Sequence, residues 1–153
     1  MKKATTNIST NKDQSERLIR CGVCAETADM VWRKNYDPCS ESDNTKSEQL
    51  CVMSYNTARI LYGENFVTPT WSLSRLLAFM PTTIQKGKAV YYLDFVPYGN
   101  KGWGFGYFNG DGIRTIKGLT QPSDPIEASV CLIEWLNSNG YELNEDNFKK
   151  FEI

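Results

Sequence analysis

The run KAVYYLDFV at residues 88–96, followed by GWGFGY at residues 102–107, decides the fold class that the sequence predicts. Alternate apolar residues of the first run share one face of an extended strand; they are Ala89, Tyr91, Leu93 and Phe95. In the second run, three aromatic residues alternate with three glycines. Residues 109–112, NGDG, tolerate the positive φ angles of a tight hairpin, and residues 113–117 follow as a third strand. We therefore expect an antiparallel meander.

Helical periodicity precedes this meander. Residues 71–80 place their aliphatic side chains on one stripe of a helix, namely Leu73, Leu76, Leu77 and Met80. Thr70 is the expected N-terminal cap, and Pro81 ends the helix because proline cannot continue the hydrogen-bond ladder. The sequence therefore predicts a helix with one face toward a core.

A second helix is predicted after the meander, over residues 124–139. Asp124 is its expected cap, Pro125 fits the first turn, and Glu127 stands at the capping-box position. Gly140 follows as a stop signal. Apolar side chains occupy most of the helix circumference, so we expect this helix to be buried on more than one side.

The N-terminal half carries weaker patterns. A short helix is expected from Lys12 to Arg20, capped by Asn11 and ended by Gly22. Strands are expected at residues 30–33 and 49–55, separated by a loop at 34–48, and the chain from 63 to 69 is expected to be irregular.

Together these elements predict an α+β fold: an antiparallel sheet of three to five strands, with the helices at about 71–80 and 124–139 packed on it. The polar residues 1–11 are expected to form a mobile tail. Residues 12–153 are expected to form a single domain, a size that supports one core.

Composition excludes several function classes. Lys and Arg number 17 against 18 Asp and Glu, so a net charge of -1 gives no general attraction to nucleic acid or anionic membranes. No stretch approaches the ~18 apolar residues of a membrane span, and the start of the chain has no secretory pattern. We therefore expect a protein of the cytoplasm that does not bind membranes.

The chain has no histidine. This absence excludes catalysis by Ser-His-Asp or Cys-His groups, acid–base catalysis by histidine, and metal sites with imidazole ligands. We expect a non-enzymatic protein without a cofactor.

Two interpretations of the cysteines stay open. Cys21, Cys24, Cys39 and Cys51 match the number of thiolates in a tetrahedral zinc site, although the second pair is widely spaced. Reduced thiols are the alternative expected in the cytoplasm, with Cys131 in the core.

Five residues are candidate binding residues: Trp71, Tyr92, Trp103, Arg114 and Lys117. Trp71 is interpreted either as an exposed anchor for a partner or as a packed residue. The aromatics of 103–107, interleaved near basic residues, have the outline of a base-stacking platform, although such alternation is also typical of a core strand. The glycines of that strand leave space that Tyr92 could fill across the ladder.

Three segments carry a resemblance to a known family. They are ETADM at 26–30, TWSLSRLL at 70–77, and IEA at 126–128 with IEWLNSNGY at 133–141. Over about residues 18–143 the chain resembles a family of small proteins carried by phages and mobile elements of gut anaerobic bacteria. That resemblance implies a bacterial host, and it brings no activity, cofactor or binding residue.

The order strand, strand, strand, helix over residues 88–136 is also similar to that of HicB-type antitoxins and of the double-stranded-RNA-binding fold. Asp124 and Glu127 stand where an RNA-binding relative would place lysines. We therefore expect a binding or accessory protein that acts through a protein partner or self-association. The alternative is a nucleic-acid- or toxin-binding module that uses strands 88–117.

Overall fold

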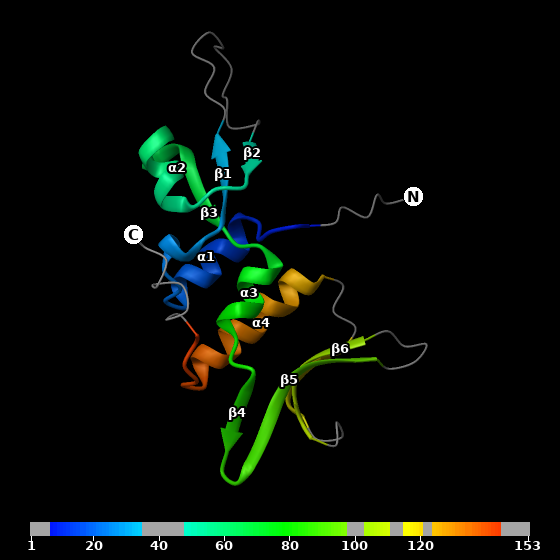
Figure 1. Ribbon diagram of the computed structural model, residues 1–153. Helices are drawn as coiled ribbons and strands as arrows, with labels where there is room; N and C mark the ends of the chain where they lie inside the picture. Colours follow the sequence, from blue (N-terminus) through cyan, green and yellow to red (C-terminus); the bar gives the residue numbers. More distant parts are fainter. Residues whose placement is uncertain (1–6, 35–47, 98–102, 111–114, 121–123, 145–153) are drawn as a thin grey trace, which may run out of the picture. The chain divides into compact units, whose positions relative to one another are not determined.

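The computed structural model describes residues 7–34, 48–97, 103–110, 115–120 and 124–144 (Figure 1). It has an α+β fold with antiparallel sheets, as predicted. The chain divides into two units, Met1–Arg75 and Leu76–Ile153, which are described separately below. The single domain expected over 12–153 stays a prediction.

The first unit contains a three-stranded sheet with the order β2-β1-β3. Its strands are β1 (Met30–Lys34), β2 (Glu48–Cys51) and β3 (Val67–Thr70). Val31 lies opposite Cys51 on one side and Pro69 on the other, and its side chain is fully buried. The central strand β1 therefore anchors the core of this unit.

Helix α1 (Lys12–Arg20) confirms the predicted N-terminal helix. The Asn11 side chain accepts a hydrogen bond from the Gln14 backbone at 2.8 Å, and the Gln14 side chain accepts one from the Asn11 backbone at 3.0 Å. This reciprocal capping satisfies two donors that a helix start leaves unpaired. Gly22, with φ of 90°, allows the chain to turn away after the helix.

The region after β2 differs from the sequence prediction. The expected strand at 49–55 ends at Cys51, and helix α2 (Tyr55–Tyr62) begins instead, capped by Ser54. A 3-10 turn, η1 (Ala25–Thr27), precedes β1, and another, η3 (Glu64–Phe66), follows α2. β3 replaces the irregular segment expected before Thr70; its Pro69 is tolerated because β3 is an edge strand.

The beginning of the described chain is held in place by polar contacts. Ser9 forms an isolated antiparallel bridge with Ser72, and Ser9 and Thr10 are both buried. The sequence predicts a mobile tail here, because a polar segment without periodicity gives no local signal. The observed order comes from hydrogen bonds that Thr10 makes with residues about 60 positions away.

Helix α3 (Leu73–Phe79) confirms the predicted helix, and it spans the boundary between the two units. Its cap differs from the expected one. The Ser72 hydroxyl accepts a hydrogen bond from the Arg75 backbone at 3.2 Å, whereas Thr70 belongs to β3. Within the predicted stripe Leu76 and Met80 are buried, and Phe79 is buried as well.

The second unit contains a four-stranded antiparallel sheet with the order β4-β5-β6-β7. Its strands are β4 (Thr83–Lys86), β5 (Ala89–Pro97), β6 (Trp103–Asn109) and β7 (Thr115–Thr120). The predicted meander corresponds to β5, β6 and β7. β4 is an additional strand, joined to β5 through Gly87 with φ of 62°.

Helix α4 (Pro125–Ser138) is capped by Asp124, whose side chain accepts a hydrogen bond from the Ile126 backbone at 3.0 Å. Seven of its residues are buried, which confirms burial on more than one side. The rings of Trp135 and Tyr107 lie 6.3 Å apart, so α4 packs on the β6 strand. The Tyr107 hydroxyl donates to the Pro81 carbonyl at 2.7 Å and ties the sheet to the chain after α3.

Candidate protein-binding surface

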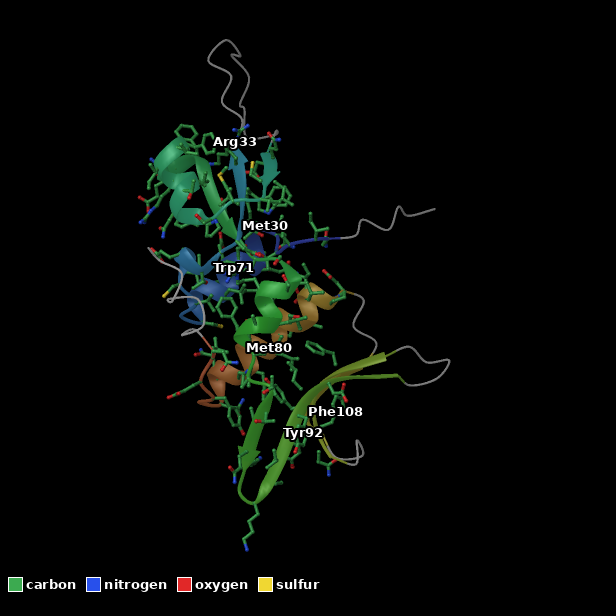
Figure 2. The ribbon with its side chains drawn as sticks, in the orientation of Figure 1. Met30, Arg33, Trp71, Met80, Tyr92 and Phe108 are labelled. Atoms are coloured by element: carbon green, nitrogen blue, oxygen red, sulfur yellow. The ribbon has the colours of Figure 1, made fainter. Side chains whose placement is uncertain are left out.

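Trp71 is a core residue. Its side chain has no exposed area, and its indole Nε1 donates to the Thr27 hydroxyl at 3.1 Å (Figure 2). A partner cannot reach this ring while the unit keeps its structure. Of the two interpretations drawn from the sequence, the structure agrees with the packed residue and not with the exposed anchor.

Tyr92 is exposed on β5. About half of it, 49%, is accessible, and it lies opposite Thr83 of β4 and Phe108 of β6 in the register (Figure 2). Val90, two positions earlier on the same face, is also exposed. Tyr92 therefore remains a candidate contact residue.

For two other candidates on the meander, Trp103 and Lys117, the structure describes the position of the backbone. Trp103 lies opposite Pro97, and Lys117 lies opposite Tyr107. Arg114 lies outside the described residues. The aromatic pair Phe105 and Tyr107 is fully buried, so these two rings are not available for base stacking. Burial raises the pKa of the Tyr107 phenol well above its usual value.

The cysteines do not gather into a metal site in the part of the chain that the structure describes. Cys24 is exposed, whereas Cys21, Cys51 and Cys131 are half-buried. In that part, no group of three or more cysteine, aspartate or glutamate side chains could hold a metal ion. Cys39, the remaining candidate ligand, lies outside the described residues.

The surface of α2 was not found from the sequence. One side of this helix packs inward through Tyr55 and Ala58, which are buried, and α2 lies beside β1 and β3 (Figure 1). Ile60 is 80% exposed and Leu61 is 61% exposed. With the exposed residue Thr57 they form what we call the α2 outer face.

Phe66 adds apolar area at the end of α2. It is 39% exposed, and its ring lies 3.5 Å from the position that a Cβ atom on Gly63 would occupy. Exposed aliphatic side chains scattered singly are normal on soluble proteins, whereas large contiguous apolar patches mark surfaces used for contact. Ile60 and Leu61 are adjacent in the sequence, so the α2 outer face is the leading candidate site.

Charged groups lie near the Tyr55 ring on the inward side of α2. Arg59 lies 3.8 Å from Glu26, and its guanidinium is 5.9 Å from the centre of the Tyr55 ring. Desolvation raises the pKa of the Tyr55 phenol, and the nearby carboxylate of Glu64 raises it further. Glu64 takes part in no ion pair within the described ranges. Arg59 therefore lies on the Tyr55 side of α2, and Glu64 follows the helix after Gly63.

A second arginine contacts the C-terminal end of α2. The Arg33 guanidinium stacks 4.7 Å from the centre of the Tyr62 ring and donates to the Gln49 side chain at 3.0 Å (Figure 2). This contact holds the C-terminal end of α2 against β1. The exposure of Ile60 and Leu61 is thus fixed by a helix anchored at both ends.

The chain matches no protein-family model, and neither the curated proteins nor the solved structures include a match. Among the described residues, none of the helices has both the length and the apolar character needed to cross a lipid bilayer.

A sequence signal for α2 does exist. Ser54 is a good helix cap, and Gly63 stands one residue after the last helical position. The apolar residues between them do not show a clean stripe, because two of the aliphatic side chains face outward. The lack of a clean apolar stripe makes α2 hard to predict from the sequence. The outward-facing side chains of Ile60 and Leu61 define the candidate site.

Proposed function

We propose that this protein is a non-enzymatic binding or accessory protein of phage or mobile-element origin. In this proposal it acts in the cytoplasm of a bacterial host through protein contacts made by the α2 outer face. The observation that carries the proposal is the exposure of two adjacent aliphatic side chains, Ile60 and Leu61, on an anchored helix.

The energetics support a contact of moderate strength. Burying a fully exposed aliphatic side chain contributes about 1.5–3 kcal/mol, so the exposed parts of Ile60 and Leu61 together would contribute ~2–4 kcal/mol. This corresponds to a factor of roughly 30 to 1,000 in Kd. Helices that dock through a few neighbouring apolar anchors are a recurring mode of protein recognition.

A capture experiment with three baits tests this proposal. The baits are the wild-type chain, the double variant Ile60→Asp/Leu61→Asp and the control Ile19→Asp, which alters an exposed residue of helix α1. Proteins enriched from a bacterial host lysate by the wild type and by the control should be lost with the double variant. An identical set of captured proteins with all three baits would show that α2 is not the contact surface.

The second candidate function is a nucleic-acid- or toxin-binding module similar to HicB-type antitoxins. One observation favours it: β5, β6, β7 and α4 follow one another in the order expected from that likeness. Gel shifts with single- and double-stranded RNA and DNA over a salt series separate it from the leading proposal. Phosphate contacts must weaken as salt rises, so a salt-sensitive complex that survives Ile60→Asp/Leu61→Asp would favour this module.

A further inference from the structure

We infer that the open edge of β4 binds the same edge of a second copy of this chain, antiparallel about a two-fold axis at Ile84. β4 is an outer strand of the four-stranded sheet, with β5 as its neighbour (Figure 1). Two-fold pairing is the commonest form of self-association. The inference goes beyond the proposed function, because this edge belongs to the second unit and α2 belongs to the first.

The open backbone groups of β4 belong to Thr83 and Gln85. In an antiparallel pair, successive residues turn their backbone groups alternately toward the neighbouring strand and away from it. The Leu93 N–H donates to the Thr82 carbonyl at 2.9 Å, so the backbone groups of Thr82 and, two positions later, of Ile84 face β5. The N–H and C=O groups of Thr83 and Gln85 therefore face away from β5.

These groups are accessible. Thr83 and Gln85 are both exposed, whereas Ile84 between them is buried. Among the described residues, neither Thr83 nor Gln85 has a backbone hydrogen bond to a segment outside the sheet. A row of open donors and acceptors at the edge of a sheet binds an extended chain by adding a strand. The occupant that fits this edge is therefore another strand.

β4 itself is a complementary strand in one register. With the axis at Ile84, Thr83 of one copy lies opposite Gln85 of the other, and each of the two such pairs exchanges two hydrogen bonds. An axis at Thr83 would place Gln85 opposite Pro81, which has no N–H. An axis at Gln85 would place Thr83 opposite Gly87, which has φ of 62° in the turn. The residues that flank β4 therefore favour the register centred on Ile84.

The outer face of the sheet gains a continuous row of side chains in this arrangement. Tyr92 lies opposite Thr83, and Val90 lies opposite Gln85. Tyr92 and Val90 are 49% and 40% exposed. Across the joined edges, the row runs from Tyr92 and Thr83 of one copy to Gln85 and Val90 of the other. Cross-strand neighbours of this kind stabilise a sheet, so the pairing gives the exposed Tyr92 a place in the interface.

The charges of β4 permit this pairing. Lys86 would lie opposite Thr82 of the second copy, so no lysine faces another lysine, an arrangement that would be destabilising. At a net charge of -1, two copies repel each other very little. β4 has only four residues, so the joined edges bury less than the ~1,200 Å² of a standard interface. We therefore expect a concentration-dependent dimer.

Sedimentation velocity of the full-length chain, from about 1 µM to about 500 µM, covers the range expected for an interface below standard size. The wild type should shift from monomer to dimer within this range. Gln85→Pro removes an N–H that faces away from β5, so the monomer keeps its sheet while the dimer loses two hydrogen bonds, one on each side of the axis. Association should weaken by roughly tenfold or more.

Gln85→Thr is the matched control. Like the proline variant, it lacks the side-chain amide that donates to the Gly87 carbonyl at 3.2 Å, but it keeps the backbone N–H. It should dimerise as the wild type does, and circular dichroism verifies that both variants are folded. A dimer that Gln85→Pro weakens no more than Gln85→Thr does would overturn the role of the β4 edge.

A charge exchange tests the register. In Thr83→Glu/Gln85→Lys, each glutamate faces a lysine of the other copy, so this variant should associate at least as strongly as the wild type. In Thr83→Lys/Gln85→Lys, lysines face each other on both sides of the axis, and association should be weaker. Two added positive charges change the net charge of this variant from -1 to +1, so general repulsion stays small. Equal association of the two variants would overturn the axis at Ile84.

The outcomes for this inference and for the proposed function are separable. A wild-type chain that stays monomeric over the whole range overturns the second copy as occupant of the β4 edge and leaves the lysate capture through α2 untouched. Ile60→Asp/Leu61→Asp should leave the dimer intact. Loss of the dimer with that variant would mean that the copies associate through α2, and it would overturn the inference.

Discussion

Thr10 and Trp71, which are 61 positions apart in the sequence, are joined by two hydrogen bonds. The Thr10 backbone N–H donates to the Trp71 carbonyl at 3.0 Å, and the Trp71 backbone N–H donates to the Thr10 hydroxyl at 3.0 Å. Trp32 Nε1 and the Thr70 hydroxyl both donate to the Thr10 carbonyl. Thr10 is thus the polar centre of a buried network that holds the start of the chain on the first unit.

Thr10→Val tests this network with a side chain of nearly the same shape. The substitution leaves the buried Trp71 N–H without its acceptor, which costs about 1–3 kcal/mol in the free energy of unfolding. Urea denaturation followed by tryptophan fluorescence measures this loss. Thr83→Val, at an exposed position of β4, is the control and should change the free energy by less than about 0.5 kcal/mol. Equal values for the two variants would show that the network is not stabilising.

Trp71→Ala should be among the most damaging substitutions in the first unit. Removing a fully buried indole leaves a cavity, and such changes cost about 3–5 kcal/mol. Leu61→Ala removes an apolar side chain from an exposed position and should cost less than about 0.5 kcal/mol. Denaturant midpoints for the two variants test the contrast. A Trp71→Ala protein as stable as the wild type would contradict the core role.

Asp124→Ala should weaken the start of α4. The Asp124 side chain accepts a hydrogen bond from the Ile126 backbone, and loss of an N-terminal cap costs about 0.5–2 kcal/mol. Asp124→Ser keeps an oxygen acceptor and should recover most of the stability. Thermal unfolding followed by far-ultraviolet circular dichroism compares the three proteins. If serine and alanine behave alike, the side chain is not acting as a cap.

The stability of the second unit should fall at high pH because of Tyr107. Burial raises the pKa of this phenol in the folded chain, whereas in the unfolded chain it titrates near its ordinary value of about 10. Above that pH the unfolded chain loses a proton that the folded chain keeps, so the free energy of unfolding decreases as the pH rises. Below about pH 10 the two states bind the proton equally, and Tyr107 adds no slope.

Tyr107→Phe separates this effect from the other tyrosines. The variant should lose about 1 kcal/mol of unfolding free energy at neutral pH, because phenylalanine lacks the hydroxyl that donates to the Pro81 carbonyl. It should also show a shallower decline in stability between about pH 9.5 and 11.5, the range in which an ordinary tyrosine ionises. Denaturation at a series of pH values measures both quantities. An unchanged slope would mean that Tyr107 titrates normally.

Elements with local start and stop signals were predictable, except α2, whose apolar residues form no clean stripe. α1, α3 and α4 each have a cap and a terminating glycine or proline within one or two residues of their ends. The meander was predictable because the period-two alternation of side chains extends over both β5 and β6. By contrast, β3 and β4 have four residues each, and pairing with a distant strand stabilises them more than any local preference does.

The candidate site could not be predicted because exposure is a tertiary property. Trp71 and Ile60 are both apolar, and nothing local distinguishes the fully buried ring from the side chain that is 80% exposed. The binding role considered for Trp71 followed from its position at the start of the predicted helix, opposite the leucine stripe, whereas in the structure its side chain is fully buried and its indole donates to Thr27.

By itself, the sequence determined the α+β class, the helices α1, α3 and α4, and the absence of histidine chemistry, because helix signals, periodicity and composition act within a few residues. Only the tertiary structure decided that Thr10 is buried and that Ile60 and Leu61 are exposed. The physical reason is that burial depends on which distant segments meet. Thr10 reaches Trp71 across 61 positions, and α2 turns its aliphatic pair outward because Tyr55 and Ala58 already fill the space beneath it.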